Sequence, residues 1–144
     1  MLAFVPTEPW HCEFVGERLR EGDRAELQLM GMAGPAAALE SLRGSVAAST
    51  MLIDGEPAAV LGLGVVDLVG GIGCPWLLTT AAVERCRVAF ARSMRELLAQ
   101  ALRITPRLEN VVDARYTRAI ALAHWLGFHV DAPRAGLRRF WMET

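Results

Sequence analysis

Apolar residues recur near every third or fourth position over the longest patterned segment of the chain, residues 81–102. Val83, Phe90 and Met94 belong to this apolar stripe, and arginine and glutamate side chains occupy much of the opposite side. A period near 3.6 residues predicts an amphipathic helix. Thr80 stands directly before the segment, where its side-chain oxygen can accept a hydrogen bond from the first helical N–H groups.

A second, shorter helical pattern covers residues 117–126. Its apolar stripe consists of Ala119, Leu122, Ala123 and Leu126. Gly127 follows at the place where a helix often ends in a left-handed residue, a conformation that glycine adopts without steric cost. We expect Phe128 to begin the next strand.

The first half of the chain predicts three helices and a β-hairpin. The helices are expected over residues 8–20, from Asp23 to Met32, and over residues 36–43; Asp23 and Glu26 resemble a capping box. Two runs rich in small and β-branched residues, 45–53 and 57–66, flank Asp54-Gly55, which is a strong hairpin signal. Further strands are expected at residues 2–5, 74–78, 107–114, 128–131 and 137–142.

This order of elements predicts one α/β domain, residues 1–144, with a mixed sheet flanked by helices. A strand, a long helix and another strand in succession imply a parallel pair, because a crossover needs a long connection. The hairpins imply antiparallel pairs in the same sheet.

Residues 110–128 resemble the last conserved block of the GNAT (N-acetyltransferase-like) fold, which typically reads Asn-x-x-Ala-x-x-Leu-Tyr-x-x-x-Gly-Phe. The matching residues are Ala119, Leu122, Gly127 and Phe128. Tyr116 stands at the usual asparagine position, and Ala123 replaces the tyrosine that often serves as general acid. The resemblance therefore implies a GNAT-like α/β fold that keeps the motif's packing residues but lacks the asparagine and the tyrosine that serve its chemistry.

The same resemblance implies that coenzyme A would place its pyrophosphate at the N-terminus of the long helix, where N–H groups attract anions. The family signature there is Arg/Gln-x-x-Gly-x-Gly/Ala, but residues 78–85 contain no glycine, and Glu84 would repel phosphate. Thr79, Thr80 and Arg85 are the cofactor-binding candidates. We expect neither a bound cofactor nor measurable acetyl-CoA binding, and no catalytic residue is assigned.

Composition excludes several other classes. Of the 144 residues 53% are hydrophobic and 22% charged, which argues against disorder, and glycines and charges interrupt every long apolar run. The three cysteines lack CxxC spacing, and the three histidines show no metal-binding spacing, so free thiols and no metal are expected. The N-terminal residues do not resemble a secretory signal. A location in a virion or host cytoplasm is expected, neither secreted nor in a membrane.

Charge is unevenly distributed along the chain. Residues 1–80 contain 4 arginines and 10 acidic residues, whereas residues 81–144 contain 11 arginines and 6 acidic residues. A solvated face, a nucleic-acid surface and a protein interface are all compatible with this, but the near-zero net charge argues against a specific nucleic-acid partner. The interface candidates are Arg85, Arg92, Arg95, Trp125, Arg138 and Trp141.

Trp76-Leu-Leu-Thr-Thr, the arginine-rich helix and the C-terminal block together resemble the GNAT-like internal virion proteins of short-tailed phages, over about residues 45–144. This resemblance implies a non-catalytic phage virion or morphogenesis protein that binds other virion proteins and itself. The alternative is an acetyl-CoA-dependent N-acyltransferase with a degenerate cofactor loop.

Overall fold

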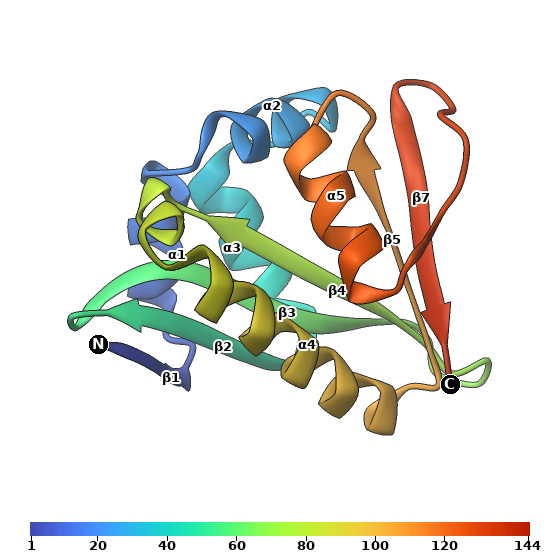
Figure 1. Cartoon of the computed structure of the whole chain (residues 1–144), viewed down its shortest axis with the longest axis horizontal. Helices are drawn as coiled ribbons and strands as arrows, with labels where there is room; N and C mark the ends of the chain where they lie inside the picture. Colours follow the sequence, from blue (N-terminus) through green and yellow to red (C-terminus); the bar gives the residue numbers. More distant parts are fainter. The chain divides into compact units, whose positions relative to one another are not determined.

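A computed structural model describes all residues, 1–144, and contains one seven-stranded mixed sheet with the strand order β1-β2-β3-β4-β5-β7-β6 (Figure 1). The chain divides into two compact units, the first formed by residues 1–64 and 76–87, the second by residues 65–75 and 88–144. Strands β3 and β4 run from one unit into the other. The predicted fold class, a mixed α/β sheet flanked by helices, is confirmed.

Three antiparallel strands belong to the first unit: β1 (Leu2–Pro6), β2 (Ser45–Ile53) and most of β3 (Glu56–Asp67). Strands β2 and β3 form the predicted hairpin. Asp54 and Gly55 have positive φ angles of 50° and 83°. A two-residue hairpin loop in a type I′ turn requires a positive φ at both of these positions.

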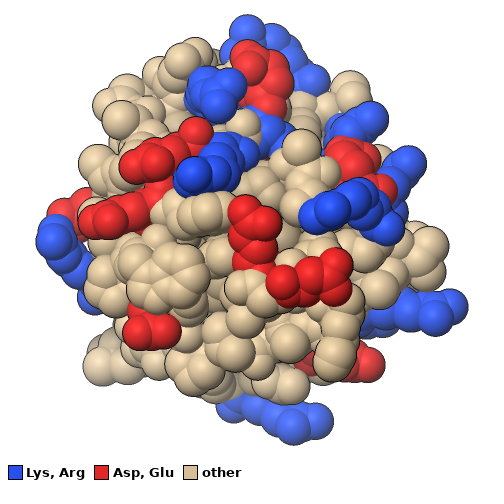
Figure 2. Space-filling model, turned by 90° about the vertical axis from the view of Figure 1, so that its left-hand side faces the viewer, with Lys and Arg blue, Asp and Glu red and all other residues tan.

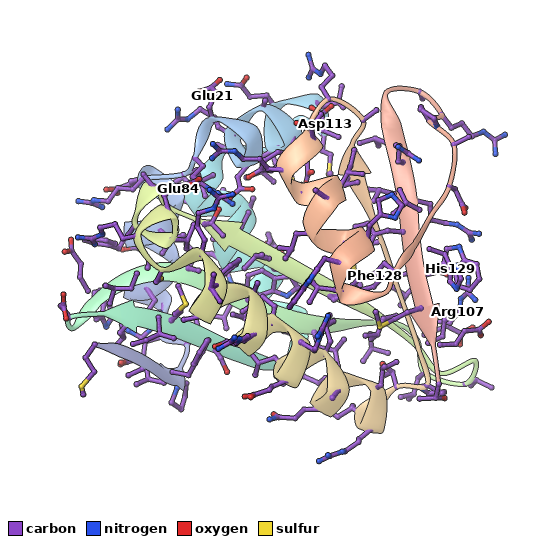
Figure 3. All side chains as sticks on the ribbon, viewed as in Figure 1. Glu21, Glu84, Arg107, Asp113, Phe128 and His129 are labelled. Carbon is purple, nitrogen blue, oxygen red and sulfur yellow. The ribbon has the colours of Figure 1, made fainter.

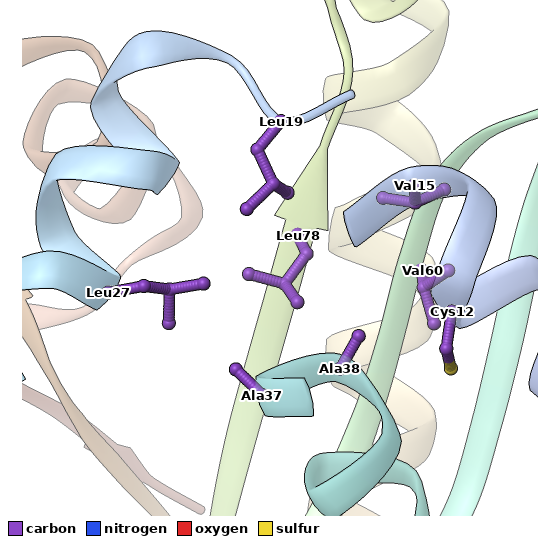
Figure 4. Close-up of a cluster of buried hydrophobic side chains, with 8 residues drawn as sticks. All are labelled: Cys12, Val15, Leu19, Leu27, Ala37, Ala38, Val60 and Leu78. Carbon is purple, nitrogen blue, oxygen red and sulfur yellow. The ribbon is translucent and has the colours of Figure 1, made fainter. Parts of the chain in front are cut away.

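The helices of the first unit are α1 (Pro9–Glu17), α2 (Glu21–Leu29) and α3 (Gly34–Arg43). Helices α1 and α3 pack closely, since a Cβ atom on Gly16 would lie 2.6 Å from the Pro35 backbone. Their apolar sides meet β3 and β4 in the cluster of Figure 4, which contains Cys12, Val15, Leu19, Leu27, Ala37, Ala38, Val60 and Leu78. This cluster is the core of the first unit.

Several predicted helix boundaries in the first unit need correction. The helix expected over 8–20 ends at Glu17, and the one expected over 36–43 begins at Gly34. The second helix begins at Glu21, so the capping-box prediction was wrong: Asp23 lies in the first turn and its side chain binds elsewhere. The Asp23 carboxylate instead accepts hydrogen bonds from two buried donors, the N–H and the hydroxyl of Thr79.

Strand β4 (Ile72–Thr79) leads to a short 3₁₀ helix, η1 (Ala81–Cys86), and then to α4 (Arg87–Ile104) and β5 (Arg107–Asp113). The segment predicted as one helix from residue 81 therefore starts as a tighter 3₁₀ turn. Ile72 pairs with Arg107 and Gly73 with Leu108 in parallel. The predicted parallel pair around the long helix is confirmed.

The second unit is completed by α5 (Thr117–Leu126), β6 (His129–Val130) and β7 (Leu137–Glu143), and Figure 1 shows α5 beside β5 and β7. Gly127 has a φ of 100°, and the N–H of Phe128 donates to Ala123 O at 3.0 Å, which confirms the predicted left-handed helix end. Phe128 is buried against Phe140 and precedes the strand, which begins at His129.

His11 is a buried histidine on α1 that the sequence pattern did not single out. Its Nδ1 atom accepts a hydrogen bond from the Glu8 N–H at 3.0 Å and lies 2.9 Å from the Thr50 hydroxyl. Burial lowers the pKa of His11 below its ordinary value, and the nearby Glu8 carboxylate only partly offsets this. The folded chain thus holds a neutral imidazole that caps α1.

None of the helices combines the length and the apolar character that a membrane-crossing helix requires.

Replacing Gly127 by valine should lower the free energy of unfolding by about 1–3 kcal/mol. An ideal Cβ atom there meets no neighbour within 4 Å, so the cost comes from the positive φ alone. Chemical denaturation measures it. Gly44→Ala is the matched control, because Gly44 also ends a helix but has a φ of −85°. Equal stability of Gly127→Val and the parent would contradict the helix-end geometry.

Acidification should destabilise the chain through His11. The unfolded histidine gains a proton below about pH 6.5, whereas the folded one resists it, so the free energy of unfolding falls as pH decreases through that value. In urea denaturation at about pH 7.5 and pH 5.5, His11→Asn should reduce the pH dependence. The exposed His124→Asn variant serves as control; if it flattened the profile as much as His11→Asn, His11 would not be the responsible group.

Candidate functional site

The end of β4 and the beginning of the helical segment form the region that the sequence identified as the cofactor position. Thr80 has an extended backbone, and its side-chain oxygen accepts a hydrogen bond from the Ala82 N–H at 3.3 Å, so it caps the helix as predicted. The same hydroxyl donates to Ala58 O on β3 at 2.9 Å. Both hydrogen-bonding functions of this side chain are therefore used within the protein.

Thr79 is fully buried and is held by α2. Its N–H and its hydroxyl donate to the same Asp23 oxygen, Oδ2, at 2.7 and 2.5 Å. Its hydroxyl oxygen also accepts a hydrogen bond from Arg20 Nε at 2.7 Å. Thr79 thus has a structural position, and its hydroxyl has no free capacity for an external ligand.

Arg20 ties the connection between α1 and α2 to the end of β4. Its backbone N–H donates to Thr79 O at 3.0 Å, and the preceding residue, Leu19, forms a bridge with Thr80. Its guanidinium Nη1 binds Glu84 Oε1 at 2.8 Å, and only 20% of its side chain is exposed. The sequence-based analysis missed Arg20, which is 64 residues away from Glu84 in the chain.

Glu84, labelled in Figure 3, lies in η1 at the start of the helical segment. Besides Arg20 it has Arg87 as a neighbour, with Nε 3.9 Å from Oε2. Arg85 is exposed in the same turn. Arg20, Arg85 and Arg87 carry three positive charges, and Glu84 and the Asp23 carboxylate bound to Thr79 carry two negative ones, so the net charge around this helix start is +1. The repulsion of phosphate inferred from Glu84 alone therefore does not describe the local field.

The residues present fit a phosphate-bearing ligand at this position in charge, although not through a glycine-rich loop. Ala81 and Ala82 place only methyl groups at the first helical positions. Two residues before Thr79 on β4, Leu77 directs its backbone N–H and C=O toward the same strand edge as Thr79, because these directions alternate along a strand. The site thus offers arginines and backbone groups, while both threonine hydroxyls are committed.

The motif residues that the GNAT fold uses for chemistry lie in the second unit. Tyr116 is the N-cap residue of α5 and makes no side-chain cap. Ala123 is buried, with 7% exposure, and supplies no hydroxyl group. Nearby at the end of β5, hydrogen bonds from Arg115 hold the pKa of Asp113 below its ordinary value, so this carboxyl is ionised at neutral pH.

Most of the predicted interface residues contact groups of the second unit itself. Arg95 stacks over Trp125 with its guanidinium carbon 3.8 Å from the ring centroid, and Arg138 donates to Asp131 O. The Trp141 ring on β7 stacks on the His129 ring of the neighbouring strand β6. The guanidinium carbon of Arg107 lies 4.4 Å from the centroid of the Trp141 ring. Figure 3 labels both partners on the sheet. The two remaining candidates, Arg85 and Arg92, are exposed. An interface role for the six residues stays a prediction.

Charges of both signs are mixed on the face drawn in Figure 2, where arginines and acidic residues lie beside one another. No group of three or more histidine, cysteine, aspartate or glutamate side chains is placed to bind a metal ion.

The fold is similar to solved acetyltransferase structures over the whole chain. The GNAT domain of PAT from S. lividans aligns with 99% of this chain and 89% of its own, at 13% identity and a TM-score of 0.72. An acetyltransferase from Thermus thermophilus aligns with 100% of this chain and 97% of its own, at 18% identity and a TM-score of 0.71. An acetyltransferase of the GNAT family from Streptococcus pneumoniae covers both chains completely, at 13% identity and a TM-score of 0.67.

At the level of sequence, no family model matches the chain. A search of curated proteins also gives no match.

These structural similarities correct the functional interpretation drawn from the sequence. The interpretation as a non-catalytic phage virion protein is contradicted, because the similar structures are acetyltransferases and nothing in the comparisons connects the chain with internal virion proteins. What the comparisons show at these identities is the architecture: the chain has the GNAT acetyltransferase fold.

Proposed function

We propose that this protein is an N-acyltransferase that uses acetyl-CoA as its acyl donor. The observation that carries the proposal is the similarity of the entire chain, 99–100% of its length, to structures described as acetyltransferases. The similarity includes both units, so it is not confined to a shared sheet. The sequence-based expectation of no cofactor is replaced by this proposal.

The diphosphate of the donor would be held where β4 passes into η1. Arg20, Arg85 and Arg87 provide positive charge at this position. Glu84 pairs with Arg20 and Arg87, so it orders these side chains while offsetting part of their positive charge. This charge balance compensates for the missing glycines, which otherwise let a backbone approach phosphate closely.

The pantetheine arm of the donor carries amide groups that suit a strand edge. Leu77 presents a backbone N–H and a C=O on one edge of β4, and an extended ligand can add to such an edge through main-chain hydrogen bonds. When bound, acetyl-CoA would supply its acyl group as a thioester: a C–N bond to the amine substrate would form as the C–S bond breaks, and the coenzyme would leave as a thiol that takes up the proton lost by the amine. The contribution of this chain is to bind and orient the donor, a contribution that by itself lowers the barrier of a two-substrate reaction.

Isothermal titration calorimetry with acetyl-CoA tests the proposal directly. We expect saturable binding with a dissociation constant of about 1–100 µM, typical of a cofactor used at cellular concentrations. Release of free thiol from acetyl-CoA in the presence of a panel of primary amines then measures the transfer. AMP, which lacks both the diphosphate and the pantetheine, is the ligand control. No heat of binding with acetyl-CoA up to about 1 mM would reject the proposal and restore the expectation that the loop binds no cofactor.

A further inference from the structure

Arg20 has hydrogen-bonding capacity that its contacts leave unused. A guanidinium carries five N–H donors. The contacts of Arg20 within the protein use Nε, bound to Thr79, and one direction of Nη1, bound to Glu84. The side chain is 20% exposed. The remaining donors are those that an external anion would use without breaking either internal contact.

The guanidinium of Arg20 is held in a fixed position. Its Nε partner, the Thr79 hydroxyl, is itself bound by Asp23 at 2.5 Å. The Arg20 backbone is bound to Thr79 O, and Glu84 holds the far end of the side chain. An arginine that is already ordered loses little conformational entropy when a ligand binds, which raises the affinity that each new hydrogen bond provides.

The position of Arg20 supplies what the loop before the helix lacks. Residues 78–85 contain no glycine, so a phosphate group would meet methyl groups there instead of open backbone. Arg20 comes from a distant part of the chain and meets the first helical turn through its contact with Glu84. The planar fork of a guanidinium matches the spacing of phosphate oxygens.

We propose that Arg20 is the residue that anchors the diphosphate of the acyl-CoA donor, supplied by the connection between α1 and α2 in place of a glycine-rich loop. This inference rests on the proposed function. Glu84 is then a positioning residue, which orients Arg20 by holding Nη1 and at the same time weakens the field that the phosphate experiences.

A purely structural role for the Arg20–Glu84 pair makes a different prediction from a role in binding. If the pair only stabilises the fold, removing either partner breaks the same contact and should weaken ligand binding in the same direction. If Arg20 binds phosphate, Arg20→Gln removes a cation and Glu84→Gln removes an opposing anion. The two substitutions should then change donor affinity in opposite directions.

The experiment measures the dissociation constants of acetyl-CoA and of S-acetylpantetheine, which lacks the nucleotide diphosphate, for the full chain and three variants. Arg20→Gln should weaken acetyl-CoA binding about 10- to 100-fold, the effect of one charge-assisted contact. Arg20→Lys should recover part of the loss, and Glu84→Gln should bind acetyl-CoA as tightly as the parent or more tightly. Affinity for S-acetylpantetheine should change little in all three.

Thermal denaturation of each variant shows whether it is folded. If Arg20→Gln does not fold, the Arg20→Lys and Glu84→Gln variants still test the inference, because weaker acetyl-CoA binding by Glu84→Gln contradicts it. Unchanged acetyl-CoA affinity in Arg20→Gln would also overturn it, as would equal losses for both ligands. A parent chain that binds no acetyl-CoA would reject the proposed function itself, whereas a parent that binds with an Arg20-independent affinity would reject only the role of Arg20.

Discussion

One buried carboxylate determines how the end of β4 is built. Asp23 accepts hydrogen bonds from both the backbone N–H and the hydroxyl of Thr79, and the Thr79 hydroxyl oxygen in turn accepts a hydrogen bond from Arg20 Nε. A buried charge is tolerated only where hydrogen bonds replace its lost water, and this arrangement provides them. Because Arg20 also binds Glu84, one set of contacts joins α2, the end of β4 and the start of the helical segment.

Those parts of the fold that depend on neighbouring residues could be predicted from the sequence. Asp54 and Gly55 specify a tight turn through their own backbone preferences, and the strands on either side then pair. Gly127 ends α5 because glycine adopts the required φ of 100° without steric cost. The long helix was recognisable from its period, although its first turn is 3₁₀. In each case the determining interaction lies within a few residues of the feature.

The candidate site could not be predicted in the same way, because its partners are distant in sequence. Asp23 looked like a helix cap and is instead bound to a residue 56 positions later. Glu84 was interpreted only as a negative charge, whereas in the structure it pairs with Arg20, which is 64 residues away in the chain. The virion interpretation failed for a related reason: it weighed the missing residues of a local motif, whereas the similarity to acetyltransferases lies in the arrangement of the whole chain.

The first unit is discontinuous in sequence, and this affects how the chain can fold as it is synthesised. Residues 1–64 emerge from the ribosome before residues 76–87, which contain Thr79 and Glu84. Until then Asp23 and Arg20 have no access to these partners, and the apolar side chains facing Leu78 stay uncovered. The unit can close only after more than half of the chain has been made. A slow stretch of translation placed before residues 76–87 have left the ribosome would therefore prolong the exposure of an unfinished core and favour aggregation, whereas one placed after they have left it would give the unit time to close.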